Sequence, residues 1–120
     1  MTFTIPGRLP GLNEVTNTNR RNKFAGAKLK KDTEQCISLY IKSQCSLKFE
    51  VVSIQYDWYE KDKRRDIDNV SSAKKFINDA MVKCGVIPND DQRHVKGFTD
   101  NFYVDKDNPR IEITIREVEK

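Results

Sequence analysis

Two carboxylates one residue apart, Asp66 and Asp68, lie beside a run of cations in the segment KDKRRDIDN. In an extended segment, residues i and i+2 point to the same side, so both carboxylates can face one point. Carboxylate oxygens suit a hard divalent cation such as Mg²⁺, and the adjacent Arg64 and Arg65 suit an anionic substrate. Asp and Asn are also favoured at helix N-caps, so a capped helix start near Asn69 with surface salt bridges is the alternative interpretation.

A second acidic pair, Asp90 and Asp91, follows the next helical pattern. Two carboxylates rarely hold Mg²⁺ tightly without a substrate phosphate, whereas three or four can hold one or two ions. A helix of about 16 residues spans about 24 Å, which places Asp90 far from Asp66 unless the following loop doubles back. An ordinary solvated Asn-Asp-Asp turn is the alternative.

Two lysines, Lys74 and Lys75, lie on the intervening helical pattern. Lys75 is seven residues after Asp68 and therefore on nearly the same helix face. It could stabilise negative charge on a phosphoryl group, or it could form an i,i+4 ion pair with Asp79 on a solvated helix. His94, the one histidine, could act as a base but is more typical of a structural residue.

The net charge of +4 is unevenly distributed. Residues 1–31 hold seven cations and one carboxylate, which gives +6 and leaves −2 for the rest of the chain. A basic arm of this kind indicates an anionic partner, although a solubilising surface is the alternative. Its cations are Arg8, Arg20, Arg21, Lys23, Lys28, Lys30 and Lys31.

Cysteine usage and hydropathy bear on the compartment. The three cysteines show no CxxC spacing, which disfavours a structural zinc site and fits a reducing environment. The first residues lack the apolar run of a signal peptide, and no segment of about 20 apolar residues could span a membrane. We therefore expect a cytoplasmic protein without membrane association.

The remaining patterns predict the elements that position these residues. Apolar spacings of three and four predict two main helices, and alternation predicts four strands. Residues 13–25 show little periodicity and are expected to form an open loop. A parity change between Val51 and Val52 indicates a bulge or a strand covered on both faces. The expected order is a strand over 3–5, a helix over 27–43, a strand over 47–59, a helix over about 70–84 that stops at Gly85, and a hairpin of strands over 95–104 and 111–115.

This order predicts a single α+β domain over residues 1–120. Its helices would lie on one side of a small mixed or antiparallel sheet of about four strands. Trp58 and Tyr59, on one of these strands, are expected in the core or at a dimer contact, and base stacking is the alternative.

Three motifs in order resemble the RusA family of Holliday junction resolvases, especially its phage-type members. They are Arg65-Asp66-Ile67-Asp68-Asn69, then Lys74-Lys75-Phe76-Ile77-Asn78-Asp79-Ala80-Met81, then Asn89-Asp90-Asp91 after Gly85. The opening Ile5-Pro6-Gly7-Arg8-Leu9-Pro10-Gly11-Leu12-Asn13 is also similar. The resemblance covers nearly the whole chain and is fairly specific as an ordered set.

The resemblance implies a homodimeric endonuclease that depends on Mg²⁺, with Mn²⁺ as a substitute, and cuts four-way DNA junctions by paired nicks. Asp66, Asp68 and Asp91 would be catalytic metal ligands, with Asp90 beside them. Lys75 would be the catalytic lysine, with Lys74 as the alternative. DNA contacts would come from Arg8, Asn13, Arg20, Arg21, Lys23, Lys28, Lys30, Lys31, Arg64, Arg65, Asn69 and Lys74. A non-catalytic branched-DNA-binding module, and a nuclease for flaps or RNA, are the competing hypotheses.

Overall fold

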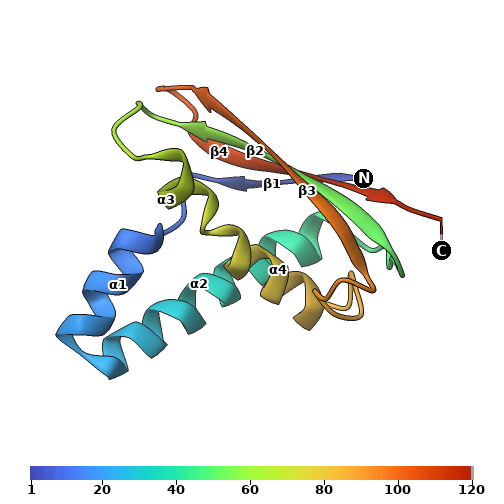
Figure 1. The fold of residues 1–120 in the computed structure, drawn as a ribbon, viewed down its shortest axis with the longest axis horizontal. Helices are drawn as coiled ribbons and strands as arrows, with labels where there is room; N and C mark the ends of the chain where they lie inside the picture. The colour runs from blue at the N-terminus through green and yellow to red at the C-terminus, as the bar shows by residue number, and fades with distance from the viewer. Residues whose placement is uncertain (120) are drawn as a thin grey trace.

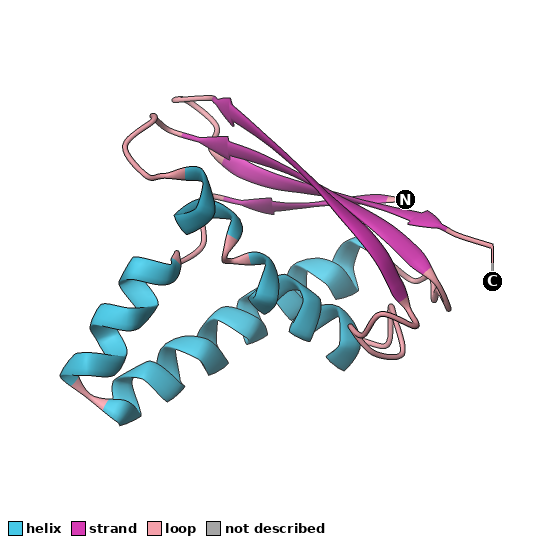
Figure 2. Ribbon diagram, in the orientation of Figure 1, coloured by secondary structure: helices cyan, strands magenta, loops and turns pink. Residues whose placement is uncertain are grey.

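The chain forms a four-stranded sheet with its helices on one face, as the computed structural model of the protein shows for residues 1–119 (Figures 1 and 2). The α+β class, the mixed sheet and the one-sided helix layer predicted from the sequence are thereby confirmed. The elements are β1 (Thr2–Pro6), α1 (Leu12–Arg21), α2 (Lys23–Gln44), β2 (Val52–Glu60), α3 (Ile67–Ser71), α4 (Lys74–Lys83), β3 (Val95–Val104) and β4 (Arg110–Glu117).

The sheet order is β1-β4-β2-β3, so the predicted hairpin between the last two strands is wrong. β4 pairs antiparallel with both β1 and β2, whereas β3 pairs parallel with β2. The reason lies in burial. Ile111, Ile113 and Ile115 of β4 are almost completely buried, which favours a central strand, whereas most of β3 is at least partly exposed and occupies the edge.

The parallel β2–β3 pair requires a crossover, and α3 and α4 supply it. The carboxyl ends of β2 and β3 therefore lie at one end of the sheet, where Glu60 is paired with Val104. The loop that carries Asp66 leaves β2 at this end.

The core lies between the sheet and the helices. Tyr56 and Trp58 of β2 face the helices and are buried, which confirms the core position of Trp58. Tyr59 points to the opposite face, where its ring stacks on Tyr103 of β3. The other largest buried side chains are Phe3, Ile5, Ile37, Ile41, Ile54, Ile77, Met81, Ile87, Ile113 and Ile115.

Residues 13–25 form helix instead of the predicted open loop. α1 and α2 meet at Asn22 and form a hairpin that projects from the rest of the molecule (Figure 1). The Glu14 side chain accepts the backbone N–H of Gly11, and the Asn22 side chain accepts the N–H groups of Phe24 and Ala25. α1 buries no residue of its own and has only two apolar residues, Leu12 and Val15, so its apolar pattern is too short to predict a helix, although the Gly11-to-Glu14 spacing was an available capping signal.

The strand and helix boundaries also shift. The strand predicted over 47–59 begins at Val52, and a register irregularity lies between Val52 and Ser53, one residue beyond the predicted parity change. The helix predicted over 70–84 is divided into α3 and α4 by Ser72 and Ala73. Gly85 ends α4 with φ of 77° as predicted, because this left-handed conformation is accessible to glycine.

Two smaller points concern the described residues. Cys36, Cys45 and Cys84 are all free thiols. Among residues 1–119, no helix has the length and apolar character needed to span a membrane.

Candidate active site

The two aspartates of the DxDN segment lie at the start of α3. Asp66 is the N-cap, with extended backbone and no capping bond from its side chain, and Asp68 lies within the first helical turn. The extended backbone predicted for the DxDN segment is therefore wrong at Asp68, because the helix begins at Ile67. Both side chains are solvent-exposed, and Asp68 Oδ1 accepts only the adjacent Asn69 N–H, at 2.9 Å. Within residues 1–119, neither carboxylate is ion-paired.

A hollow of about 480 Å³ lies beside Asp66 at the carboxyl ends of β2 and β3. In open sheets with parallel strands, ligands bind outside these strand ends. Apolar walls come from Ile67, Val70 and the end of β3, and polar groups come from the loop after β2. Its lining consists of Glu60, Asp62, Lys63, Arg65, Asp66, Ile67, Val70, Phe102, Tyr103 and Val104.

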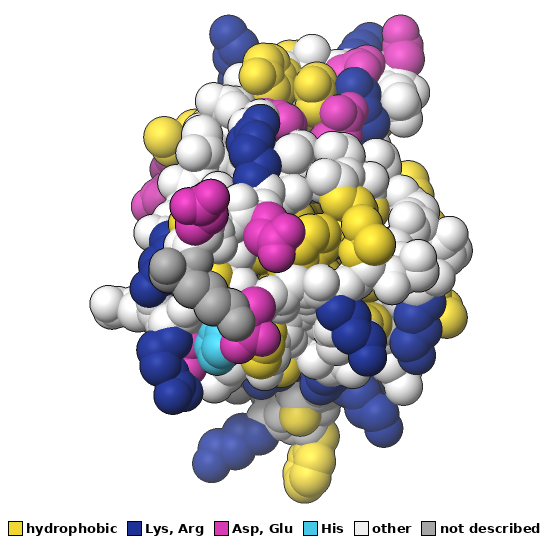
Figure 3. Space-filling view, turned by 90° about the vertical axis from the view of Figure 1, so that its right-hand side faces the viewer, with side chains coloured by type: hydrophobic (Ala, Val, Ile, Leu, Met, Phe, Trp, Pro, Cys, Tyr) yellow, Lys and Arg dark blue, Asp and Glu magenta, His cyan; other side chains and the backbone are white. Residues whose placement is uncertain are grey.

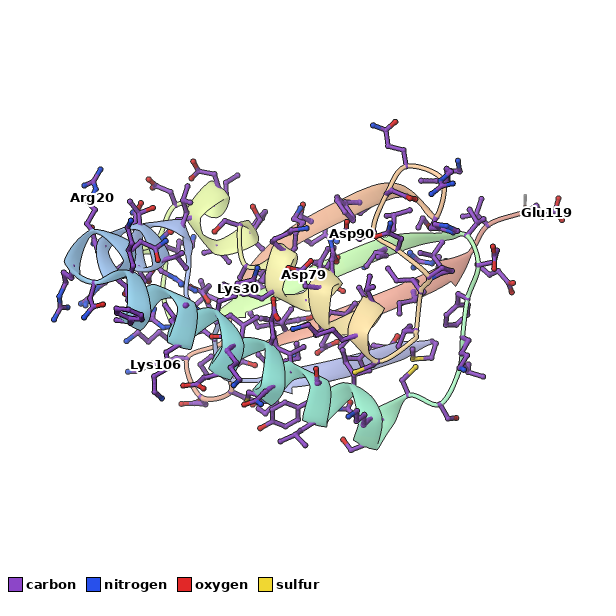
Figure 4. The ribbon with its side chains drawn as sticks, turned by 90° about the horizontal axis from the view of Figure 1, so that it is seen from below. Arg20, Lys30, Asp79, Asp90, Lys106 and Glu119 are labelled. Carbon is purple, nitrogen blue, oxygen red and sulfur yellow. The ribbon has the colours of Figure 1, made fainter. Side chains whose placement is uncertain are left out.

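The structure brings together two other predicted site residues, Lys75 and Asp90. Lys75 Nζ lies 3.3 Å from Asp90 Oδ2 and 3.1 Å from Asp79 Oδ1. The loop after α4 thus turns back along the helix, and Figure 4 shows Asp79 and Asp90 near one another beside α4. The hydrogen bond to Asp79 raises the pKa of Lys75; desolvation opposes this, and Asp90 reinforces it. Lys75 therefore carries a firmly held positive charge.

Asp91 lies at the other end of the sheet from Asp66. It precedes β3 by four residues, whereas Asp66 lines the hollow formed by the last residues of that ten-residue strand. A strand of this length spans about 30 Å. Figure 3 looks at the right-hand side of the molecule in Figure 1 and shows the single histidine, in cyan, on this side, whereas α3 lies toward the left in Figure 1.

Asp91 is also engaged locally. Its carboxylate contacts the Arg93 guanidinium at 3.1 Å and accepts the backbone N–H groups of Arg93 and His94. Partial desolvation raises the pKa of Asp91, but the hydrogen bond and charge of Arg93 outweigh it and leave that pKa below its usual value. His94 Nδ1 contacts the Glu50 carbonyl at 2.9 Å, which gives this histidine a structural contact.

The predicted metal ligands therefore divide into two groups within one chain. Asp66 and Asp68 are exposed and have no cationic partner within residues 1–119, which fits a divalent ion with oxygen ligands. Asp90 and Asp91 are bound to Lys75 and Arg93. Among residues 1–119, no three acidic, histidine or cysteine side chains are grouped to hold a metal ion.

The predicted DNA-contacting cations gather on the helical hairpin. Arg20, Arg21 and Lys23 are exposed at its tip, and Arg20 extends from the end of α1 in Figure 4. Lys30 and Lys31 line a second hollow of about 540 Å³ together with Lys75. Lys28 is also exposed and forms an ion pair with Asp32. Arg8 and Arg64 are exposed elsewhere on the surface.

Three other residues predicted to contact DNA make internal contacts. Arg65 has a side chain only 11% exposed and binds Glu60 through Nε and Nη2, at 2.8 and 3.0 Å. It also donates to the Leu9 carbonyl. The buried Asn69 side chain accepts the backbone N–H of Asn13 at 2.9 Å, while Asn13 itself is exposed.

Sequence reasoning missed Asp100. Its carboxylate accepts the Trp58 indole N–H at 2.9 Å and forms an ion pair at 2.5 Å with Lys74, another residue predicted to contact DNA. The Lys74 ammonium also lies over the rings of Tyr56 and Phe98. The sequence held one signal for this residue. Phe98, Asp100 and Phe102 lie on the same face of the predicted strand, so Asp100 is a charged residue between two apolar ones.

A comparison with protein-family models finds a match over most of the chain. The model described as "Endodeoxyribonuclease RusA" matches residues 13–116, which include the DxDN segment, both lysines and the Asp90–Asp91 pair. No curated protein matches the chain.

Proposed function

Since this chain belongs to the RusA family of endodeoxyribonucleases, we propose that it is a divalent-metal-dependent resolvase that cuts four-way DNA junctions by paired nicks. The observation that carries the proposal is the family match over residues 13–116, because it contains all of the candidate catalytic residues. We further propose that the protein acts in the cytoplasm during DNA recombination and repair.

Asp66 and Asp68 are the ligands proposed to hold the ion, Mg²⁺ with Mn²⁺ as a substitute. Both carboxylates are exposed and lack a cationic partner among the described residues, so they are available as oxygen ligands. A bound ion would activate the attacking water and neutralise charge on the scissile phosphate. Two carboxylates are few for Mg²⁺, so phosphate oxygens of the DNA would complete the set.

Asp91 can join Asp66 and Asp68 as a metal ligand only from a second copy of the chain or after a rearrangement of its loop. Within one chain it lies at the opposite end of β3 from Asp66. A two-fold homodimer brings unlike parts of two copies together and presents two equivalent sites to two DNA strands. We propose that such a dimer supplies Asp91, with Asp90 beside it, and that its symmetry gives the paired nicks.

Lys75 is proposed to stabilise charge on the phosphoryl oxygens. Asp79 and Asp90 keep it protonated, and protonation is the state required for that role. Lys74 is less available, since it is paired with Asp100. The exposed cations of the α1–α2 hairpin are proposed to bind flanking phosphates, so affinity should fall steeply with salt.

A panel of substrates in Mg²⁺ tests the proposal. Four-way junctions, flaps, linear duplex, single-stranded DNA and structured RNA would each be incubated with the full-length protein, and products resolved on denaturing gels. We expect symmetric nicks in the junction that disappear with a chelator and return with Mg²⁺ or Mn²⁺. Binding without nicking of any substrate would instead indicate a non-catalytic module. Preferential cutting of flaps or RNA would indicate a nuclease of another substrate class.

A further inference from the structure

The hollow beside Asp66 gathers exposed apolar side chains that the catalytic proposal does not use. Ile67 is 62% exposed, Tyr103 45% and Val104 48%, and all three line this hollow. Phe102, partly buried against the core, lies on the same wall. The apolar surface therefore comes from two segments far apart in sequence, the start of α3 and the end of β3.

We propose that this hollow receives one unstacked nucleobase of the DNA strand being cut, next to the scissile phosphate, and thereby sets the cleavage-site preference. The inference rests on the proposed function and specifies how its site reads DNA. The hollow and the candidate metal ligands share Asp66, so an occupant of the hollow adjoins the phosphate that Asp66 and Asp68 would address.

The size and walls of the hollow fit this occupant. A volume of about 480 Å³ lies within the range of small-molecule sites, about 300–1,000 Å³. Aromatic and aliphatic walls accept the face of a base regardless of its sequence. A four-way junction supplies such bases, because pairs at the branch point are more easily unstacked than pairs within a continuous duplex.

The polar rim favours a base over a phosphate. Glu60, Asp62 and Asp66 place three carboxylates around the hollow, against the two cations Lys63 and Arg65. Arg65 is ion-paired with Glu60. The Asp62 carboxylate is 36% exposed, accepts the backbone N–H of Arg64 and lies 3.6 Å from the exposed Arg64 guanidinium, a loose surface contact that a base can replace. A carboxylate accepts hydrogen bonds from the exocyclic amino groups of cytosine, adenine or guanine, and thymine has no such group. Asp62 is therefore the residue expected to discriminate among bases.

The test is a map of nick positions on a mobile four-way junction whose branch point can migrate through all four bases. In Mg²⁺, we expect the wild-type protein to nick mainly beside bases that carry an amino group. Asp62→Asn should reduce the ratio of preferred to non-preferred nicks by about tenfold, which corresponds to ~1.4 kcal/mol of discrimination. Ile67→Ala and Val104→Ala should flatten the same map, and both side chains are exposed enough that the core stays intact.

Matched controls separate the outcomes. Leu39→Ala removes an aliphatic side chain of α2 that is 69% exposed and lies outside the hollow, and it should leave the map unchanged. If the wild type and the hollow variants all nick the junction with identical maps, the base-site inference is overturned while the nuclease function stays intact. No nicking by wild type would instead remove the function on which the inference rests. If the Ile67→Ala and Val104→Ala variants keep the wild-type map but shift the monomer–dimer equilibrium in sedimentation, a second copy of the chain covers the hollow. That result also overturns the inference.

Discussion

The side-chain oxygen of Asn69 accepts the backbone N–H of Asn13 at 2.9 Å, across 56 positions of the chain. This bond joins the DxDN segment to the first turn of α1 and therefore to the basic hairpin. Gly11 lies so close to Asn69 that an added Cβ would be 2.4 Å from its Oδ1. The buried Asn69 amide therefore helps to hold the candidate metal ligands against the candidate DNA-binding arm, together with Arg65, whose guanidinium binds the Leu9 carbonyl and lies 3.4 Å from the Glu14 carboxylate of α1.

Asn69→Ala should therefore loosen the hairpin. The N–H of Asn13 would lose its partner, at a cost of about 1–2 kcal/mol of unfolding free energy. Urea denaturation measures the change, and a junction-binding titration should show weaker affinity. Asn108→Ala, in the exposed β3–β4 turn, is the control. Unchanged affinity together with the expected loss of stability would show that the hairpin and α3 act independently.

The adjacent arginines should behave differently when removed. Arg65→Ala leaves Glu60 in a largely enclosed site without its partner, which should cost about 3 kcal/mol of stability. Arg64→Ala should leave stability unchanged, because the Arg64 side chain is 87% exposed. If Arg64 binds a phosphate, Arg64→Ala should lower the slope of log affinity against log salt by about one. Arg65→Lys, which keeps the charge of the internal ion pair, should leave that slope unchanged when it is properly folded. An equal salt slope in both variants would contradict this division of roles.

Gly26 permits the close approach of α1 and α2. A Cβ on Gly26 would lie only 1.6 Å from Asn19 Oδ1. Gly26→Ala should therefore lower stability by about 1–3 kcal/mol, although alanine is the better helix former by about 1 kcal/mol. The double variant Asn19→Ala/Gly26→Ala should recover much of the loss, as measured by thermal unfolding. Stabilisation by Gly26→Ala alone would show that the exposed Asn19 side chain turns away without cost and that this contact does not require a glycine.

Asp68→Asn should abolish cleavage while leaving junction binding intact. The substitution removes a charged oxygen ligand from an exposed position, and metal-ion stabilisation worth several kcal/mol makes the expected rate loss about a thousandfold or more. Gel-shift and nicking assays on the same preparation measure both properties. Glu117→Gln removes an exposed carboxylate near the start of β2 and should cut normally. Normal cutting by Asp68→Asn would remove this residue from the proposed site.

The Asp105–Arg110 ion pair predicts a dependence of stability on pH. The hydrogen bond from Arg110 at 2.8 Å lowers the pKa of Asp105 below its ordinary value of 3.8. A lowered folded-state pKa adds stability above the unfolded-state value, and this stability is lost as pH falls through the folded-state value. Asp105→Asn should therefore be less stable than wild type at pH 7, and the difference should shrink below about pH 4. Urea titrations at several pH values measure it, with Asp107→Asn as the control; a difference independent of pH would contradict the assignment.

Much of the local structure was predictable from the sequence. Alternation identified β4 with its buried Ile111, Ile113 and Ile115, and the three-and-four spacing identified the core face of α4. Gly85 marked the helix end because a left-handed residue is required there. The ordered DxDN, lysine and Asp90–Asp91 motifs identified the family. The strand, helix and helix-end signals depend on neighbours within a few positions, and the family motifs are an ordered match of the sequence itself, so the sequence alone determined both.

Only the tertiary structure decided which elements are neighbours. Alternation shows which face of a strand is buried but not which strand pairs with it, so the parallel pairing of β3 with β2 could not be read locally. That pairing forms the hollow at Asp66 and places Asp91 at the opposite end of the sheet. The contact of Lys75 with Asp90 and the burial of Asn69 against Asn13 likewise depend on long-range packing. Long-range pairing is selected by the burial that the whole core achieves, and no short stretch of sequence carries that information.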